Sequence, residues 1–238
     1  MNIVVFQSIT TDNFEQNLSN LISLIEKQEN NSFILASELT LNGYAYDRMD
    51  DAVDITNNAK KKLLKLSKDK TISLTMTTKN GAHYYNTFFM FHDQKIIHTQ
   101  SKNKLFVLND ERVYFTNGSE DDIKIFELNG LKIAMLICFE LRFIDLWKKI
   151  QGADIVLIPA MWGIKRKENF ETLTKALAVM NQCFVVASDS ANNDMAKSSG
   201  IITPFGEEYR DDNQEVLSKI IDLKDIKKFR RYMQVGIN

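Results

Sequence analysis

Short apolar runs alternate with segments of helical periodicity along most of the chain, and this alternation constrains the fold more than any other feature. The runs predict strands over residues 2–6, 32–37, 71–78, 83–92, 95–100, 131–138, 154–160, 183–188 and in 200–207. Helical spacing predicts helices over 14–25, 51–68, 141–151, 167–181 and a basic helix from Asp225, the first capped by Asp12 and Glu15. Strand–helix pairs with a β-rich middle predict an α/β fold, a four-layer α-β-β-α sandwich of two mixed sheets flanked by helices.

Composition favours an ordinary globular chain with a large core. Hydrophobic residues make up 44 % and charged residues 26 % of the 238 residues, which is typical of soluble domains. The chain has two prolines and nine glycines, and no repeat, linker or shift in composition marks a boundary. We therefore expect a single domain over residues 1–238.

Charge and cysteine usage argue against several classes of protein. The 30 Lys and Arg nearly balance the 31 Asp and Glu, so no overall charge attracts nucleic acid or an anionic membrane. The start has no signal-peptide pattern, and no apolar run reaches the length of a membrane span. Two cysteines without a CxxC pair, and three histidines confined to residues 83–98, argue against a disulfide scaffold or a metal site. A cytoplasmic protein without a metal is expected.

One cysteine stands at the end of a predicted buried strand. In "LKIAMLICFELRF" (131–143), Cys138 closes the apolar run and polar residues follow at once. A buried cysteine of the core is one interpretation. A nucleophile is the other, because loops after strands hold the chemistry of open α/β sheets and a nearby helix N-terminus favours a thiolate. Cys183 begins a buried strand and is interpreted as structural.

A nucleophilic thiol needs a base, and the sequence offers acids and lysines rather than histidines. All three histidines lie on or beside the 83–98 hairpin, which disfavours a Cys–His pair. Glu38 directly follows the strand 32–37, in a position suited to a general base. Lys102 and Lys104 follow the strand 95–100, where a lysine can stabilise an oxyanion. Taken singly, each of these residues also fits an ordinary surface position.

Taken together and in chain order, Glu38, Lys102 and Cys138 resemble the Glu–Lys–Cys triad of the nitrilase superfamily of carbon–nitrogen hydrolases. The matching segments are "ASELTLNGY", "KNKLF" and "CFELRF", with further similarity in "YNTFFMF", "GADIVLIPAMW", "NQCFVVAS" and "GIITPFGE". The family's lysine precedes the Leu-Phe pair by three and four positions, which selects Lys102 over Lys104. Phe139-Glu140 replaces the common Tyr-Asp, Lys104 replaces a usual His, and Ala-Ser replaces a frequent Pro before the acid.

The resemblance implies a mechanism without a metal or organic cofactor. Cys138 would attack a small amide after Glu38 takes its proton, with release of ammonia from a thioester intermediate. Lys102 and the Phe139 N–H would hold the oxyanion. The family's second glutamate maps onto Glu111, with Asp110 as the nearest competitor, and Tyr44 and Trp162 would line the substrate pocket.

The short chain and the "PAMWG" segment are most like the bacterial omega-amidase-like branch, which cleaves the terminal amide of small α-keto acid amides. An N-carbamoyl-amine hydrolase and a deaminated-glutathione amidase are alternatives, whereas nitrile hydrolysis is disfavoured because those members are longer. A catalytically silent binding or scaffold member is an alternative of a different class. Family members generally dimerise through helices near the nucleophile, so a homodimer is expected.

Overall fold

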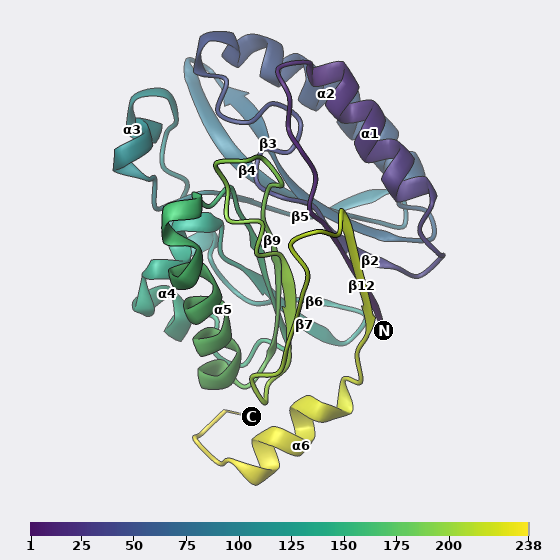
Figure 1. Cartoon of the computed structure of the whole chain (residues 1–238), viewed down its shortest axis with the longest axis vertical. Coiled ribbons are helices and arrows are strands. Elements are labelled where there is room, and N and C mark those ends of the chain that lie inside the picture. The colour runs from purple at the N-terminus through teal and green to yellow at the C-terminus, as the bar shows by residue number, and fades with distance from the viewer. Residues whose placement is uncertain (238) are drawn as a thin grey trace.

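The computed structural model describes residues 1–237 and contains two six-stranded sheets that pack against each other (Figure 1). The first sheet has the strand order β12–β1–β2–β3–β4–β5. Its strands are β1 (Asn2–Phe6), β2 (Phe33–Leu35), β3 (Thr71–Asn80), β4 (His83–His92), β5 (Lys95–Ser101) and β12 (Val216–Ile220). Strand β2 runs parallel to β1 and β3, and the other pairs are antiparallel.

The second sheet has the order β11–β10–β9–β8–β7–β6 and is also mixed. Its strands are β6 (Phe126–Leu128), β7 (Leu131–Met135), β8 (Ile155–Pro159), β9 (Phe184–Ser188), β10 (Gly200–Ile202) and β11 (Glu208–Arg210). Strands β7, β8 and β9 are parallel neighbours at its centre. Each sheet therefore has parallel strands with loops at their carboxyl ends, which is where open α/β sheets place their binding sites.

Helices cover the outer face of each sheet. Helices α1 (Phe14–Glu26) and α2 (Met49–Leu66) lie over the first sheet, and α4 (Ile144–Lys149) and α5 (Lys167–Asn181) lie over the second (Figure 1). Helix α3 (Glu111–Tyr114) is one turn, and α6 (Lys224–Tyr232) lies below the sheets. Short 3₁₀ turns are η1 (Tyr46–Arg48), η2 (Val107–Asn109), η3 (Glu120–Asp122), η4 (Cys138–Arg142) and η5 (Ile164–Arg166). The predicted four-layer α/β sandwich is confirmed.

Alternation along the strands separates two apolar layers. In β1, Ile3 and Val5 belong to the larger core cluster, which contains residues of β7, β8 and β9 and extends to α4 and α5. Val4 and Phe6 belong to the cluster packed against α1 and α2. Successive strand residues point to opposite faces, so a strand buried on both sides is apolar throughout. That is why the runs are apolar without interruption.

Three local predictions change in the structure. The strand predicted over 131–138 ends at Met135, and the helix predicted over 141–151 is divided into η4 and α4. The left-handed backbone of Cys138 (φ 47°) prevents the strand from continuing, and the extended backbone of Phe143 (φ −104°, ψ 101°) separates η4 from α4. The cap of α1 is Asn13 rather than Asp12, because the Asn13 side chain accepts the Gln16 N–H at 3.0 Å.

The described helices include none that is both long and apolar enough to cross a membrane.

Candidate active site

Lys102 lies between two buried carboxylates. Its Nζ is 2.8 Å from Glu38 Oε1 and 2.6 Å from Glu111 Oε1, and the three side chains are at most 1 % exposed. Burial lowers the pKa of Lys102, but the negative charges of Glu38 and Glu111 outweigh burial and raise that pKa above its ordinary value. Lys102 is therefore a permanent cation at physiological pH.

Sharp turns bring these side chains out of the secondary structure. Glu38 stands just beyond β2, Lys102 directly follows β5, and Glu111 opens α3. Left-handed, non-glycine residues lie at or directly beside the site: Leu39 (φ 46°) after Glu38, Asp110 (φ 54°) before Glu111, and Cys138 itself. Such conformations cost about 1–3 kcal/mol each and are typical of functional sites. The predicted positions at strand ends thus converge through strained turns.

Glu38 joins the ends of the two sheets. Its Oε1 accepts the Lys102 ammonium and, at 2.8 Å, the Asn86 Nδ2 group. Its Oε2 accepts the Met161 N–H at 3.1 Å, and its own N–H donates to Ala160 O at 3.2 Å. Ala160 and Met161 directly follow β8 of the second sheet. Glu38 therefore holds the carboxyl end of β8 against its own turn.

Asn86 is a site residue that the sequence reasoning missed. Its side chain orients Glu38, and its backbone carbonyl accepts the Lys102 N–H at 2.8 Å. It is 1 % exposed in β4, inside the "YNTFFMF" segment. An amide within an otherwise apolar strand was the available signal, because a buried polar side chain needs a partner.

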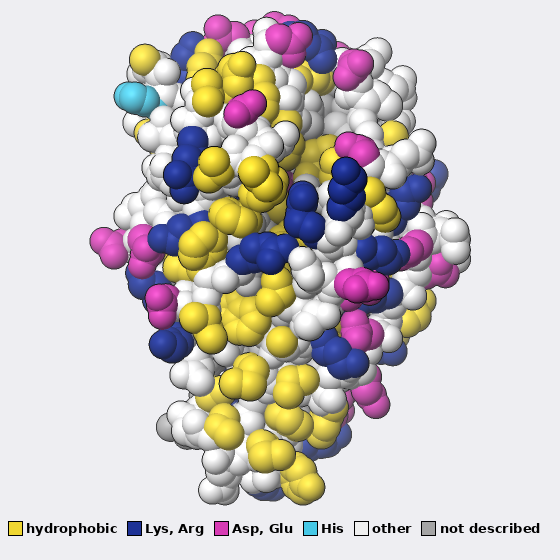
Figure 2. Space-filling model, turned by 60° about the vertical axis from the view of Figure 1, so that its left-hand side comes forward, with side chains coloured by type: hydrophobic (Ala, Val, Ile, Leu, Met, Phe, Trp, Pro, Cys, Tyr) yellow, Lys and Arg dark blue, Asp and Glu magenta, His cyan; other side chains and the backbone are white. Residues whose placement is uncertain are grey.

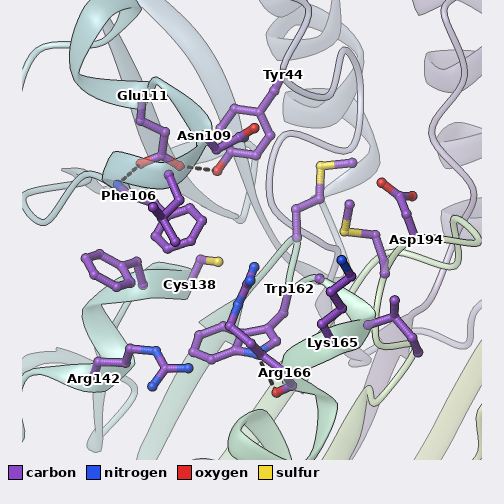
Figure 3. Close-up of a pocket in the computed structure, with 16 residues that line it drawn as sticks. Tyr44, Phe106, Asn109, Glu111, Cys138, Arg142, Trp162, Lys165, Arg166 and Asp194 are labelled. Carbon is purple, nitrogen blue, oxygen red and sulfur yellow. Dashed lines mark hydrogen bonds between the residues drawn. The ribbon is translucent and has the colours of Figure 1, made fainter.

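Cys138 opens onto a cavity of about 320 Å³, with its sulfur directed into the space between Phe106 and Trp162 (Figure 3). Burial and the Glu38 carboxylate raise the pKa of the thiol well above its ordinary value, against the opposing effects of Lys102 and a hydrogen bond from the Met161 N–H. The expectation that a helix N-terminus favours a thiolate is therefore wrong. The element after β7 is a five-residue 3₁₀ turn, and its weak dipole is outweighed by burial and the carboxylate.

The other predicted residues line the same cavity. The Tyr44 hydroxyl donates a short hydrogen bond to Glu111, and Lys102 Nζ lies 3.3 Å from that hydroxyl. Burial, followed by the Glu111 charge, raises the pKa of Tyr44 well above its ordinary value, so the phenol stays protonated. The Trp162 ring forms part of the wall, and its Nε1 donates to Arg166 O at 2.8 Å (Figure 3).

Phe139 contributes both its ring and its backbone to this region. The ring lines the cavity and lies 5.0 Å from the Phe106 ring and 5.3 Å from the Phe143 ring, centroid to centroid. As the second residue of η4, Phe139 has an N–H that no carbonyl of that turn accepts. The structure therefore brings together all seven residues predicted for the site.

Two further buried carboxylates hold the loops around the cavity. The sequence did not predict the contacts of either one. Glu140 accepts the backbone N–H groups of Ile137 (2.7 Å) and Asn103 (2.6 Å), and burial raises its pKa to about 7 against the opposing effect of these donors. Asp189 accepts the N–H groups of Trp162 (2.7 Å) and Lys197 (3.0 Å), and burial raises its pKa to about 8.

Three basic side chains surround the cavity mouth. Arg142, Lys165 and Arg166 line it, and none of them forms an ion pair with any carboxylate of residues 1–237 (Figure 3). The pKa of Arg142 is lowered by burial and then by the positive charge of Arg166. The mouth is therefore electropositive, although Asp194 also lines it.

The histidines and the second cysteine lie outside this cavity. His83 contacts Thr116, His92 contacts Thr71, and His98 stacks on Phe126. Cys183 is a free thiol, completely buried at the start of β9. Within residues 1–237, no cluster of three or more His, Cys, Asp or Glu side chains is arranged to hold a metal ion. The geometry thus offers a thiol, a buried acid pair and a cation in one place.

Comparison with known proteins identifies the family of the chain. A model of the carbon-nitrogen hydrolase family matches residues 3–231. The chain belongs to the carbon–nitrogen hydrolase family. The resemblance to the nitrilase superfamily is thereby confirmed, and this hydrolase is also similar in structure to Saccharomyces cerevisiae Nit3, a member of branch 10 of that superfamily. The TM-score is 0.86 at 19 % identity, over 99 % of this chain and 95 % of Nit3.

Two sequence relatives narrow the branch. This hydrolase is 30 % identical to the 2-oxoglutaramate amidase of Bacillus subtilis over 234 residues, which are 92 % of this chain and 90 % of that protein. It is 29 % identical to the omega-amidase YafV of Escherichia coli over 140 residues, which are 57 % of this chain and 53 % of that protein. The hydrolase therefore has relatives in the omega-amidase-like branch, as the sequence motifs predict.

The buried Asp189 makes the stability of the hydrolase depend on pH. Because its pKa is raised, the folded protein keeps the Asp189 proton at pH values where the unfolded chain has lost it. Stability therefore falls as pH rises from about 4 to about 8. An Asp189→Asn variant lacks this titration. Urea unfolding at about pH 5, 6.5 and 8 should show the variant gaining stability relative to wild type as pH rises.

The matched control for this experiment is Asp145→Asn, which removes an exposed carboxylate of α4. A difference in unfolding free energy between wild type and Asp189→Asn that does not change over this pH range contradicts the assignment.

Proposed function

We propose that this hydrolase cleaves a small amide through a thioester on Cys138, with Glu38 as general base and Lys102 as part of the oxyanion site. The observation that carries the proposal is the location of Cys138. Its thiol opens onto the cavity, and the charges of Glu38 and Lys102 both act on the thiol. This chemistry needs no group that the chain itself does not supply.

The raised pKa of the thiol means that the proton must leave as the sulfur attacks. Glu38 Oε1 already accepts from Lys102 and Asn86, whereas Oε2 accepts only the Met161 N–H. We assign Oε2 as the atom that takes the Cys138 proton. The sulfur then adds to the amide carbon, and the carbonyl oxygen becomes an oxyanion.

The remaining steps use the same groups. Lys102 and the Phe139 N–H hold the oxyanion, and Glu38 returns its proton to the nitrogen as the C–N bond breaks and ammonia leaves. Water, deprotonated by Glu38, then attacks the thioester carbon, which releases the carboxylic acid and restores the Cys138 thiol. Glu111 holds Lys102 in place and accepts the Tyr44 hydroxyl.

Cysteine replacement tests the nucleophile directly. We expect Cys138→Ala to abolish ammonia release from small amides, whereas Cys183→Ala retains it because that thiol is remote from the cavity and burial raises its pKa to about 12. Mass spectrometry of quenched turnover should detect an acyl adduct on Cys138 in wild type. Turnover that survives in Cys138→Ala rules out the mechanism.

The same panel tests the alternative functions. A catalytically silent binding member would release no ammonia from any amide, even as wild type. A Cys–His hydrolase would lose activity in a folded His98→Ala variant, although His98 stacks on Phe126 away from the cavity. We expect His98→Ala to keep wild-type turnover, and Lys102→Ala to lose it.

The substrate we propose is a small omega-amide whose far end carries a carboxylate. Among the carboxylates of residues 1–237, Arg142, Lys165 and Arg166 have no ion-pair partner. Arginine binds carboxylates through paired hydrogen bonds. The activity named in the Bacillus subtilis relative, on 2-oxoglutaramate, fits this chemistry. The 320 Å³ cavity favours such a compound over the larger substrate of a deaminated-glutathione amidase. An N-carbamoyl amine is the second candidate.

Arginine removal separates these substrates. We expect Arg166→Ala to raise KM for a dicarboxylic acid mono-amide by about 10- to 100-fold, because a charged hydrogen bond of about 1.5–3 kcal/mol is lost. The matching neutral diamide should keep its KM. Lys227→Ala, which removes a cation outside this cavity, is the control. Equal losses for both amides contradict a carboxylate site.

We also propose that the chain forms a single domain and assembles as a homodimer. The larger core cluster contains residues of both sheets, which supports one folding unit. Exposed apolar side chains continue down the lower half of one face (Figure 2). Val179 and Met180 of α5 and Phe205 and Met233 near α6 are 38–64 % exposed, as suits an isologous interface.

A reducing cytoplasm is the proposed location, because both cysteines are free thiols.

The dimer is testable by sedimentation velocity. Met180→Asp should shift the protein from dimer to monomer, because it places a charge at the centre of an apolar contact. Ile220→Asp, at an 80 % exposed position on β12, is the control and should leave the dimer intact. A wild-type protein that sediments as a monomer at micromolar concentration contradicts the proposal.

A further inference from the structure

Glu140 is a buried carboxylate two residues after Cys138, and its partners are backbone groups. Its Oε2 accepts the N–H of Ile137, the residue before Cys138, at 2.7 Å. Its Oε1 accepts the N–H of Asn103, the residue after Lys102, at 2.6 Å, with the Lys104 N–H at a longer 3.5 Å. Glu140 is 0 % exposed and forms no ion pair with any described residue.

We infer that Glu140 is a positioning residue that fixes Lys102 relative to Cys138. Its carboxylate accepts hydrogen bonds from the residue after Lys102 and from the residue before Cys138. The inference rests on the proposed function, in which Lys102 must lie beside the oxyanion that forms when Cys138 attacks.

The topology explains why such a link is needed. Lys102 follows β5 of the first sheet, whereas Cys138 follows β7 of the second. In the part of the chain that the structure describes, no ladder of backbone hydrogen bonds joins the two sheets, so neither sheet sets the distance between the two residues. The ion pairs of Lys102 go to Glu38 and Glu111, neither of which belongs to the second sheet.

Other contacts across this gap are weaker. Gln100 of β5 donates to Met135 O of β7, but at 3.4 Å. Glu38 holds the end of β8 through Ala160 and Met161, which fixes the base but not the lysine. Glu140 makes the short bonds between the Lys102 loop and the turn that carries Cys138.

The chemistry of the link requires a carboxylate. Both oxygens act as acceptors, one for each loop, and every donor is a backbone N–H. A glutamine has one acceptor and one donor, so in either orientation one N–H would face an NH₂ group. An aspartate keeps two acceptors on a stem one methylene shorter. The longer stem of Glu140 thus reaches both loops.

A comparison of Glu140→Gln and Glu140→Asp tests the inference with two reactions of Cys138. The first is amide turnover, which forms an oxyanion and so needs Lys102 in place. The second is modification by methyl methanethiosulfonate, in which the thiol, after losing its proton, forms a disulfide and expels methanesulfinate. That reaction forms no carbonyl oxyanion and therefore does not need Lys102 as a donor.

We expect Glu140→Gln to lower kcat by about 100-fold, with KM and the rate of Cys138 modification each within about threefold of wild type. Glu140→Asp should restore kcat to within about 10-fold, since it regains two acceptors. Asp154→Asn is the control. Asp154 accepts the Lys132 N–H at the opposite end of β7, so its loss should leave both reactions unchanged.

Two results overturn the inference. One is a kcat for Glu140→Gln equal to that of Asp154→Asn. The other is an equal fall of turnover and thiol modification, which indicates general loosening of the nucleophile turn. If Glu140→Gln does not fold, amide turnover and the rate of Cys138 modification are compared in Glu140→Asp instead. A lower kcat with an unchanged rate of Cys138 modification then supports the inference. Turnover in Cys138→Ala, by contrast, refutes the proposed function itself.

Discussion

The ammonium of Lys102 between Glu38 and Glu111 is the interaction on which the rest of the site depends. All three groups are removed from water, so each charge is compensated only by its partners. Removing one member of such a cluster typically costs about 3–5 kcal/mol, because an uncompensated charge stays buried. The turn after β2, the end of β5 and the one-turn helix α3 must therefore meet for the chain to fold stably. Lys102, the proposed oxyanion donor, is therefore fixed before any substrate binds.

This cluster also sets the protonation state of Cys138, the proposed nucleophile. A carboxylate near a buried thiol favours the neutral form of the thiol. The raised pKa of Cys138 therefore follows from burial and from the charge of Glu38. A neutral thiol resists adventitious reactions, since the thiolate is the reactive form. In the proposed mechanism the sulfur becomes nucleophilic only when Glu38 takes its proton. The same carboxylate that suppresses the thiolate at rest thus supplies the base for the reaction.

Buried carboxylates that accept backbone N–H groups recur around the cavity. Glu38 holds Met161, Glu140 holds Ile137 and Asn103, and Asp189 holds Trp162 and Lys197. The Glu38–Met161 and Glu140–Asn103 bonds join loops that follow strands of different sheets. A carboxylate can accept several N–H groups at once, so one side chain satisfies donors that would otherwise be buried without partners. The cost is the pH dependence that the raised pKa values of Glu140 and Asp189 imply.

The sequence by itself determined nine of the strands, but not β6, β11 and β12. It also determined the α/β class and the candidate site residues at strand ends, because the apolar period and the order of Glu38, Lys102 and Cys138 are local properties. It also located Glu111, through the motif that follows Lys102. Only the tertiary structure decided that Asn86 orients Glu38, that Glu140 reaches Asn103, and that Arg166 joins Arg142 at one cavity mouth. It also reversed the expected direction of the Cys138 pKa. The Asn86–Glu38 and Glu140–Asn103 contacts join residues 48 and 37 positions apart in the sequence. A charge or hydrogen bond between such distant segments exists only after the chain has folded.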